Sequence, residues 1–259
     1  MALVAAVPPA PAPAPSADFQ ALVLACNKDG MESLRKGQSK AAFEQFKYAE
    51  AMLGDADGDI TSLLAVTCSN LGCYYKKVGK FHGALSYLRK ALKMEVDLRT
   101  DPVTIAGTHL NICAILSKLE KHDKAVQHAL CALDLVSERV NTAEPDSISQ
   151  DDYSVLAVAY HNVAMERDFM GQYEKAAAAF AQGHRVATRC LGEDHPLTVA
   201  LGQNSEAVVQ KSQRLVRKER PLVAALGQTA DAAAQGAKRP AGTGAAAAAA
   251  RRAWLQDAD

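Results

Sequence analysis

Apolar residues recur at intervals of three and four positions through most of the chain. That spacing places them on one face of an α-helix, and no stretch shows the alternation typical of a β-strand. Pro102, Pro145 and Pro196 separate the periodic segments. In "TDPV" and "EDHPL" an acidic residue stands just ahead of the proline, which favours a helix start there. The pattern therefore predicts an all-α chain.

One sequence outline occurs three times. It begins at Asn70 in "NLGCYYKKVGKFHGAL", at Asn111 in "NICAILSKLEKHDKAV" and at Asn162 in "NVAMERDFMGQYEKAA". A small or compact residue follows two positions later in each copy, and an alanine follows twelve positions after that. These pairs are Gly72 and Ala84, Cys113 and Ala125, and Ala164 and Ala176. A weaker copy surrounds Gly30. Such periodicity is typical of a stacked array of one supersecondary unit.

Two glycines in the copy at Asn70 need an explanation, because glycine inside a helix costs about 0.5–1 kcal/mol relative to alanine. We expect Gly72 and Ala84 to lie where the two helices of a hairpin cross closely. Gly79, and Gly171 at the same place in the last copy, are expected at the turn. A left-handed backbone ends a helix there, and glycine adopts it without a Cβ clash.

The series of small, aromatic, glycine, aromatic and alanine positions resembles the tetratricopeptide repeat. The resemblance implies helical hairpins in a right-handed superhelical solenoid, closed by a C-terminal capping helix. The copies at Asn70, Asn111 and Asn162 are spaced by 41 and 51 residues, more than the usual period of about 34. This longer period and the segment "LGEDHPLTVA" are similar to kinesin-light-chain repeats. We place the repeats near 23–56, 65–98, 106–139 and 157–190, and the capping helix at 196–219.

The two ends of the chain differ from the repeat region, which we place at 18–220. Residues 1–17 are rich in proline and alanine and are predicted to be disordered. Residues 221–259 are rich in alanine and glycine and have few large apolar side chains, so we expect a flexible tail. The sequence leaves open the role of this tail with Trp254, and that of the 141–153 insertion.

The charge of the chain is balanced, with 29 Lys and Arg against 29 Asp and Glu. This balance does not favour binding to nucleic acid or to an anionic membrane. No stretch reaches the roughly 18 apolar residues of a membrane helix, so we expect no membrane insertion. The six cysteines lack metal-ligand spacing and are typical of buried thiols in a reducing compartment. These features indicate a cytoplasmic protein.

Catalytic motifs are absent from the sequence, which contains no HExxH, GxSxG, P-loop or GxGxxG pattern. His109 and Cys113 are four residues apart on one predicted helix. Cys113 takes a small crossing position, however, and a reactive thiol needs an open, electropositive site. We therefore expect no enzyme activity, no metal and no cofactor.

The resemblance implies a concave groove lined by the first helices of successive repeats. In groove-binding members of the family, an asparagine at the position of Asn70 clamps the main chain of an extended ligand. Its amide suits this role because it both donates and accepts hydrogen bonds. In the alternative, these side chains bond to neighbouring first helices. The set is Asn70, Asn111 and Asn162, with Asn204 at a comparable place in the capping helix.

Basic residues follow these asparagines at a spacing of seven, at Lys77 and Lys118. Lys28 and Arg35 hold the corresponding places in the weaker copy. A groove that is basic at its N-terminal end would suit an acidic peptide or a C-terminal carboxylate.

The function implied by the resemblance is a non-enzymatic scaffold or adaptor that binds other proteins within a multiprotein complex. The kinesin-light-chain character implies a place in a cytoskeletal or ciliary (axonemal) assembly. The alternative is a structural subunit whose groove is idle and whose convex or lateral face is embedded in the complex. Its contacts would then come from exposed residues of the second helices, namely Arg89, Lys93, Lys124 and Gln127.

Overall fold

The computed structural model describes residues 15–56, 59–144 and 147–236, with side chains described up to residue 217. It divides into two compact units between Gln210 and Lys211. The described residues are helical and contain no strand, which confirms the all-α prediction. None of the described helices is both long enough and apolar enough to cross a membrane.

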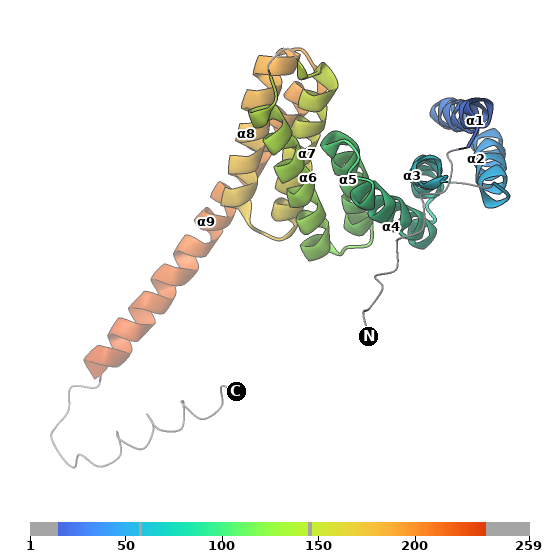
Figure 1. The fold of residues 1–259 in the computed structure, drawn as a ribbon. Helices are drawn as coiled ribbons and strands as arrows, with labels where there is room; N and C mark the ends of the chain where they lie inside the picture. The colour runs from blue at the N-terminus through green and yellow to red at the C-terminus, as the bar shows by residue number, and fades with distance from the viewer. Residues whose placement is uncertain (1–14, 57–58, 145–146, 237–259) are drawn as a thin grey trace, which may run out of the picture. The chain divides into compact units, whose positions relative to one another are not determined.

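Helical hairpins make up the first unit (Figure 1). Each hairpin pairs a first helix with a second helix, and consecutive hairpins pack against one another. The first helices are α1 (Ala17–Arg35), α3 (Thr61–Lys77), α5 (Pro102–Lys118) and α7 (Gln150–Phe169). The second helices are α2 (Ser39–Gly54), α4 (Phe81–Asp97), α6 (His122–Thr142) and α8 (Tyr173–Leu191). The last helix is α9 (Pro196–Gly236).

Side-chain caps fix where several first helices begin. The Asp101 carboxylate accepts hydrogen bonds from the Val103 and Thr104 amides at 3.1 and 3.3 Å, ahead of Pro102 at the first helical position. Ser149 and Asp152 form a reciprocal capping box on α7. Caps of this kind satisfy amides that have no partner inside the helix. The capping residues lie outside the repeated sequence outline. The first helices therefore begin four to seven residues before the predicted repeats.

The turn between the two helices of a hairpin contains one residue with a left-handed backbone. It is a glycine in three hairpins, Gly37, Gly79 and Gly171, with φ between 73° and 79°. In the third hairpin it is Glu120, with φ of 58°. A side chain in this conformation costs roughly 1–2 kcal/mol, because Cβ approaches the next carbonyl oxygen. The third turn is therefore the strained one.

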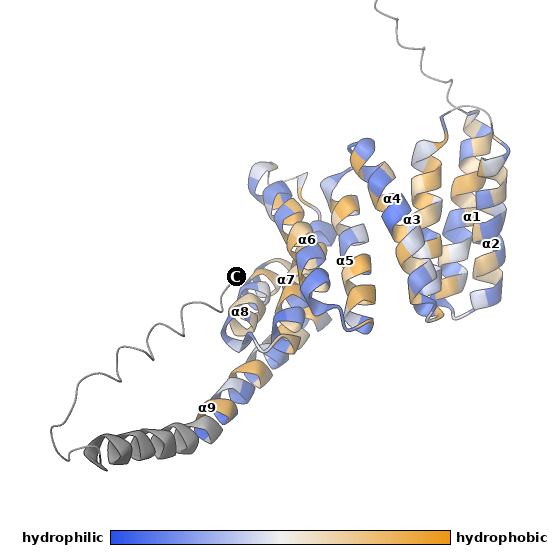
Figure 2. Cartoon of the chain, turned by 90° about the horizontal axis from the view of Figure 1, so that it is seen from below, coloured by the Kyte–Doolittle hydropathy of each residue, from blue (hydrophilic) through white to orange (hydrophobic). Residues whose placement is uncertain are grey.

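Close packing at the helix crossings depends on residues without a large side chain. A Cβ atom added at Gly72 would lie 2.5 Å from Cγ of Leu88, and one at Gly30 would lie 2.5 Å from Cε1 of Phe46. Ala84 is fully buried, as are Ala125 and Ala176. Burying a leucine or phenylalanine of this kind contributes about 1.5–3 kcal/mol, more than the cost of the glycine. Figure 2 shows hydrophobic and hydrophilic residues interleaved along each helix, as amphipathic packing requires.

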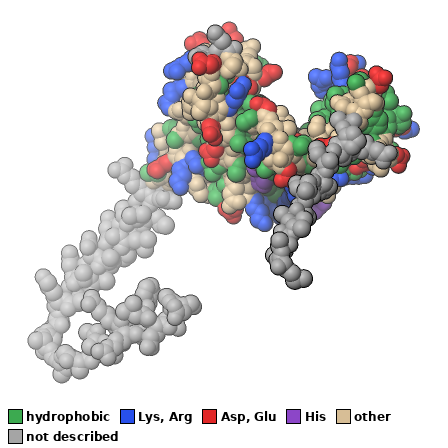
Figure 3. Space-filling view, in the orientation of Figure 1, with side chains coloured by type: hydrophobic (Ala, Val, Ile, Leu, Met, Phe, Trp, Pro, Cys, Tyr) green, Lys and Arg blue, Asp and Glu red, His purple; other side chains and the backbone are tan. Residues whose placement is uncertain are grey.

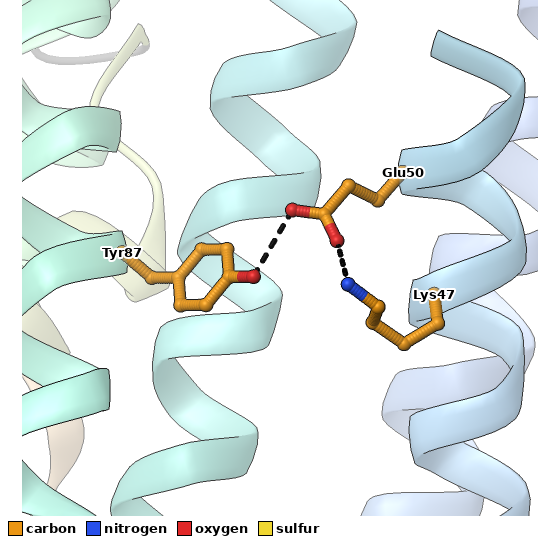
Figure 4. Close-up of polar contacts among 3 residues, drawn as sticks. All are labelled: Lys47, Glu50 and Tyr87. Atoms are coloured by element: carbon orange, nitrogen blue, oxygen red, sulfur yellow. Dashed lines mark hydrogen bonds and ion pairs between the residues drawn. The ribbon is translucent and has the colours of Figure 1, made fainter. Parts of the chain in front are cut away.

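Polar and aromatic contacts join the first two hairpins. The Tyr87 hydroxyl of α4 donates a hydrogen bond of 3.1 Å to Glu50 of α2, and Lys47 forms an ion pair with the same carboxylate (Figure 4). Phe43 of α2 stacks on Tyr74 of α3 with ring centroids 5.1 Å apart. These contacts hold the second hairpin, α3 and α4, against α2 of the first.

Helix α9 is longer than the capping helix expected at 196–219, because it continues to Gly236. The added residues include "AALGQTADAAAQ", and alanine has the strongest helix propensity of all residues. This part of the chain had been expected to belong to the flexible tail. Residues 1–14 and 237–259, including Trp254, lie outside the described residues.

Candidate functional site

A hollow of about 600 Å³ lies along the first helices α1, α3 and α5 and the start of α4. Its apolar lining comes from Met31, Leu34, Cys73, Phe81 and Ala114. Its basic lining comes from Arg35, Lys76, Lys77 and Lys118. We call it the α3 hollow. No acidic residue is among the described residues that line it.

The repeat explains why these residues meet. In successive first helices the residue after the small crossing position faces the hollow, as Met31, Cys73 and Ala114 show. The residue five positions after the crossing also faces it, and it is basic in each case: Arg35, Lys77 and Lys118. Because side chains project from a helix with a fixed periodicity, equivalent positions of stacked first helices line one surface.

Two of the lysines already make hydrogen bonds inside the scaffold. Lys77 donates to the carbonyl oxygen of Leu34, in the last turn of α1, where the helix dipole favours a cation. Lys76 donates to Oδ1 of Asn111 on α5. An ammonium group has three donors, so each lysine keeps capacity for an anionic ligand. The side chains of Arg35 and Lys118 belong to exposed residues.

The hollow contains three of the four basic residues that the sequence singled out. Lys28, the fourth, is exposed on α1 and does not line the hollow. Sequence reasoning missed Lys76. This lysine stands four positions after Gly72, where the first copy has the apolar Leu34. A search for positions that are basic in every copy therefore does not find it. The combination of an apolar floor and a cationic rim suits an acidic segment that also carries an apolar side chain.

Asn70 bonds to the neighbouring first helix. Its amide donates a hydrogen bond of 2.9 Å to Oδ1 of Asn27 on α1. Asn27 is buried and donates in turn to Thr67 of α3 at 2.9 Å. This polar network links α1 to α3. Asn27 lies one residue before Lys28, at a position where the other copies have no asparagine, so the repeat gave no signal for it.

The other three asparagines differ in their contacts. Asn111 of α5 accepts the bond from Lys76 of α3. Nδ2 of Asn204 on α9 lies 3.2 Å from Nε2 of His161 on α7. Oδ1 of Asn162 lies 3.5 Å from Nδ1 of the adjacent His161. In this structure Asn70, Asn111 and Asn204 therefore bridge neighbouring first helices, as the alternative to ligand clamping expects.

Burial keeps the most enclosed thiols protonated. It raises the pKa of Cys113 to about 12 and that of Cys68 to about 11, so neither is a ready nucleophile. His109 faces another histidine instead, with its Nδ1 2.9 Å from Nδ1 of His128. Burial lowers the pKa of His109 to about 4. Within the part of the chain that the structure describes, no three His, Cys, Asp or Glu residues are placed to hold a metal ion.

A family model described as the tetratricopeptide repeat matches residues 64–94, which cover most of the α3–α4 hairpin. The chain folds as a tetratricopeptide-repeat protein. The predicted all-α class and solenoid of helical hairpins are confirmed, and the matched segment coincides with the sequence copy that begins at Asn70. No curated protein matches the sequence.

Solved structures with the same fold include kinesin light chain nearly identical TPR-like repeats from Podosopora anserina. They share 14% identity with a TM-score of 0.61, and the match covers 86% of this chain and 100% of that one. BtubC (BKLC) from P. vanneervenii shares 17% identity with a TM-score of 0.58, covering 88% and 87%. A Rap protein complexed with competence and sporulation factor shares 16% identity with a TM-score of 0.56, covering 74% and 49%. Identities this low show the fold alone.

Proposed function

We propose that this protein is a non-enzymatic scaffold that holds a partner polypeptide on its first helices, with an acidic segment of the partner in the α3 hollow. The observation that carries the proposal is the convergence of Arg35, Lys76, Lys77 and Lys118 over an apolar floor, without an acidic residue in the lining. Charged groups that are complementary across an interface favour fast and specific association.

The asparagines are assigned a second part of this function. An amide side chain has two donor hydrogens and an acceptor oxygen, so the bond from Asn70 to Asn27 leaves capacity for a ligand. We propose that Asn70 and Asn111 meet the main chain of the partner beside the α3 hollow, while Asn204 and Asn162 act further along the first helices. Their bonds within the scaffold hold the amides in place before the partner binds.

The proposed setting is a cytoskeletal or ciliary assembly in the cytoplasm. Support for this setting is limited to the likeness in fold to kinesin light chain TPR-like repeats. The Rap protein that was solved in complex with competence and sporulation factor supports the use of such a fold in binding.

The test is recovery of partners by the full-length tagged protein from its own cells. In one variant Lys77→Glu is combined with Lys118→Glu, which reverses the charge of the α3 hollow. The matched control combines Arg89→Glu with Lys93→Glu, two exposed positions on the second helix α4. We expect the first variant to lose a partner that wild type and control retain. Loss in the control alone would favour the structural-subunit alternative and contradict the proposal.

Replacing Asn70 and Asn111 with alanine separates the two roles of the asparagines. If they clamp a ligand, partner recovery falls while the helical content and melting temperature stay close to wild type. If they serve only the scaffold, the melting temperature falls and the folded protein still recovers its partner. That second result would remove the asparagines from the proposed site and leave the basic hollow in place.

A further inference from the structure

A second hollow, of about 440 Å³, lies along α6, α7 and α8. Arg185 and Arg189 of α8 stand on one side of it, and Tyr153 and Tyr160 of α7 on another. Val140 and Asn141 come from the end of α6. We call it the α8 hollow. It shares no lining residue with the α3 hollow.

Extra helical turns build this second hollow. Counted from the buried alanines Ala84 and Ala125, α6 continues four residues beyond the point where α4 ends. Val140 and Asn141 lie in that extension. Counted from the small crossing residue, α7 begins three residues earlier than α3 and α5, and Tyr153 follows directly after the added residues. The wider spacing of the last two sequence copies thus corresponds to longer helices α6 and α7.

The chemistry of the α8 hollow favours an anion beside an apolar group. Arg185 and Arg189 are exposed and stand one helical turn apart, so both reach the same side of α8. Gln182 accepts a hydrogen bond from Nη2 of Arg185, which restrains that guanidinium while other donors remain. The floor includes Leu156, which is buried in the same apolar cluster as Val140 and Val186. None of the described lining residues is acidic.

Both signs of charge are interspersed over the face of the molecule drawn in Figure 3. A hollow with only cationic and neutral lining is therefore a local feature rather than part of a general basic surface. Arginine suits such a place because its planar fork can bind both oxygens of a carboxylate.

We propose that the α8 hollow is a second docking site, which takes an acidic extended segment of a partner protein. Carboxylates of the segment bind Arg185 and Arg189, and an apolar side chain between them rests on Leu156. The lining of α8 runs from Gln182 to Cys190, about 12 Å along the helix axis. That length fits about four residues of extended chain. This proposal rests on the scaffold function but concerns a different surface.

Because each hollow has one cysteine in its lining, one experiment can measure ligand protection at the two hollows separately. Cys73 lines the α3 hollow and Cys190 lines the α8 hollow. The full-length protein is treated with N-ethylmaleimide, with and without acetyl-Glu-Glu-Leu-Glu-Glu-amide at about 1 mM, a concentration that detects weak binding. Mass spectrometry then gives the rate of modification at each cysteine. We expect the peptide to slow modification of Cys190 at least threefold.

The variant that combines Arg185→Glu with Arg189→Glu should lose this protection, and the Arg89→Glu, Lys93→Glu control should keep it. Comparing rates with and without peptide inside each variant cancels changes in thiol reactivity, and circular dichroism verifies the fold. The proposal is overturned if Cys190 is unprotected in wild type, if protection survives the arginine reversal, or if only a phosphoserine version of the peptide protects. Protection of Cys73 in the same spectra reports on the proposed function independently.

Discussion

The α3 hollow and the α8 hollow are both basic, but they arise in opposite ways. The α3 hollow uses the regular part of the repeat, because Arg35, Lys77 and Lys118 occupy one position in three successive first helices. The α8 hollow uses departures from the repeat. Its lining includes Asn141, from an extension of α6 that α4 lacks, and its paired arginines occur once, on α8.

This difference teaches how a repeat protein acquires distinct surfaces. Stacking equivalent helices spreads one side-chain position into a row, so a single favoured residue type yields an extended site. Insertions between repeats change the length of individual helices and open hollows that no other repeat has. A site of the second kind can take a different partner segment without altering the first.

The largest effect is expected from filling the helix crossings that support each hollow. Gly72→Ala places a Cβ atom against Leu88 beside Cys73, and Gly183→Ala places one 2.8 Å from Cβ of Tyr160 in the α8 hollow. Overpacking of this kind typically costs about 1–3 kcal/mol. We expect urea titrations to show a lower free energy of unfolding. We also expect maleimide to react faster with the cysteine that lines the hollow next to the altered glycine.

Gly107→Ala is the matched control for these glycine variants, because nothing lies within 4 Å of an added Cβ atom there. It should gain about 0.5–1 kcal/mol by removing a glycine from a helix interior. Equal stability of Gly72→Ala and wild type would contradict the close crossing.

The next effect is a loss of stability on acidification, to which the histidine pair of the third hairpin contributes together with His161 of α7, whose pKa is also lowered by burial. Burial and the neighbouring His128 lower the pKa of His109 to about 4, and burial together with Arg89 lowers the pKa of His128. The folded state therefore binds fewer protons than the unfolded chain as the pH falls from about 6.5 to about 4. Stability is full above this window and decreases through it. We expect the free energy of unfolding to fall by about 1–2 kcal/mol. Residual contact of the histidines with water keeps this loss smaller than full burial would give.

His109→Gln tests this assignment, because it removes the titrating group that has the lowered pKa. Its difference in stability from wild type should change with pH across the window and should be constant above it. The comparison is made at matched pH because burial raises the pKa of Glu95, which gives a slope of the opposite sign. A constant difference between His109→Gln and wild type would rule out the histidine pair as the source.

A smaller effect is expected at the turn of the third hairpin. Glu120→Gly relieves the left-handed strain at an exposed position. Glycine also adds entropy to the unfolded chain, which offsets part of this gain, so the unfolding free energy should rise by about 0.5–1 kcal/mol. Gly79→Ala introduces the same strain in the second hairpin and should lower stability by a similar amount. Thermal unfolding measures both, and a loss of stability in Glu120→Gly would contradict the account of the turn.

The smallest effect concerns the native thiols without any ligand. Cys131 is exposed and should react first with maleimide, whereas Cys113 and Cys68 should react last because burial encloses them and raises their pKa. Cys73 and Cys190 are partly buried and should lie between these extremes. Peptide mapping over time gives the order. Fast modification of Cys113 would reopen the question of a reactive thiol on α5.

The parts of the molecule that repeat could be predicted from the sequence. The repeated spacing and the family resemblance together predicted the hairpins and the shared surface of Lys77 and Lys118, because the same local pattern recurs several times. The start of α5 at Pro102 followed from the acidic residue ahead of the proline in "TDPV", whereas the start of α7 at the Ser149 cap was not predicted because that cap occurs once. The bond between Asn70 and Asn27 was left undecided, since helix propensity does not distinguish an amide that faces a ligand from one that faces a neighbour.

The α8 hollow could not be predicted, for a physical reason. Arg185 and Arg189 look like an ordinary exposed face of a helix until the extensions of α6 and α7 place Asn141 and Tyr153 beside them. That meeting depends on helix lengths, which the 141–153 insertion sets through a capping box at Ser149. The interval of 51 residues between the last two copies indicates extra residues, but it does not show where a helix ends or begins.

The most direct test of the central claim is to find out which surface touches a partner in cells. A photo-crosslinking amino acid is placed at Ala114, inside the α3 hollow, and in a second protein at Lys93, exposed on α4. The account predicts that Ala114 captures one partner through a segment rich in aspartate or glutamate, and that Lys93 captures none. Capture at Lys93 with none at Ala114, or capture at Ala114 of a segment without acidic residues, would contradict it.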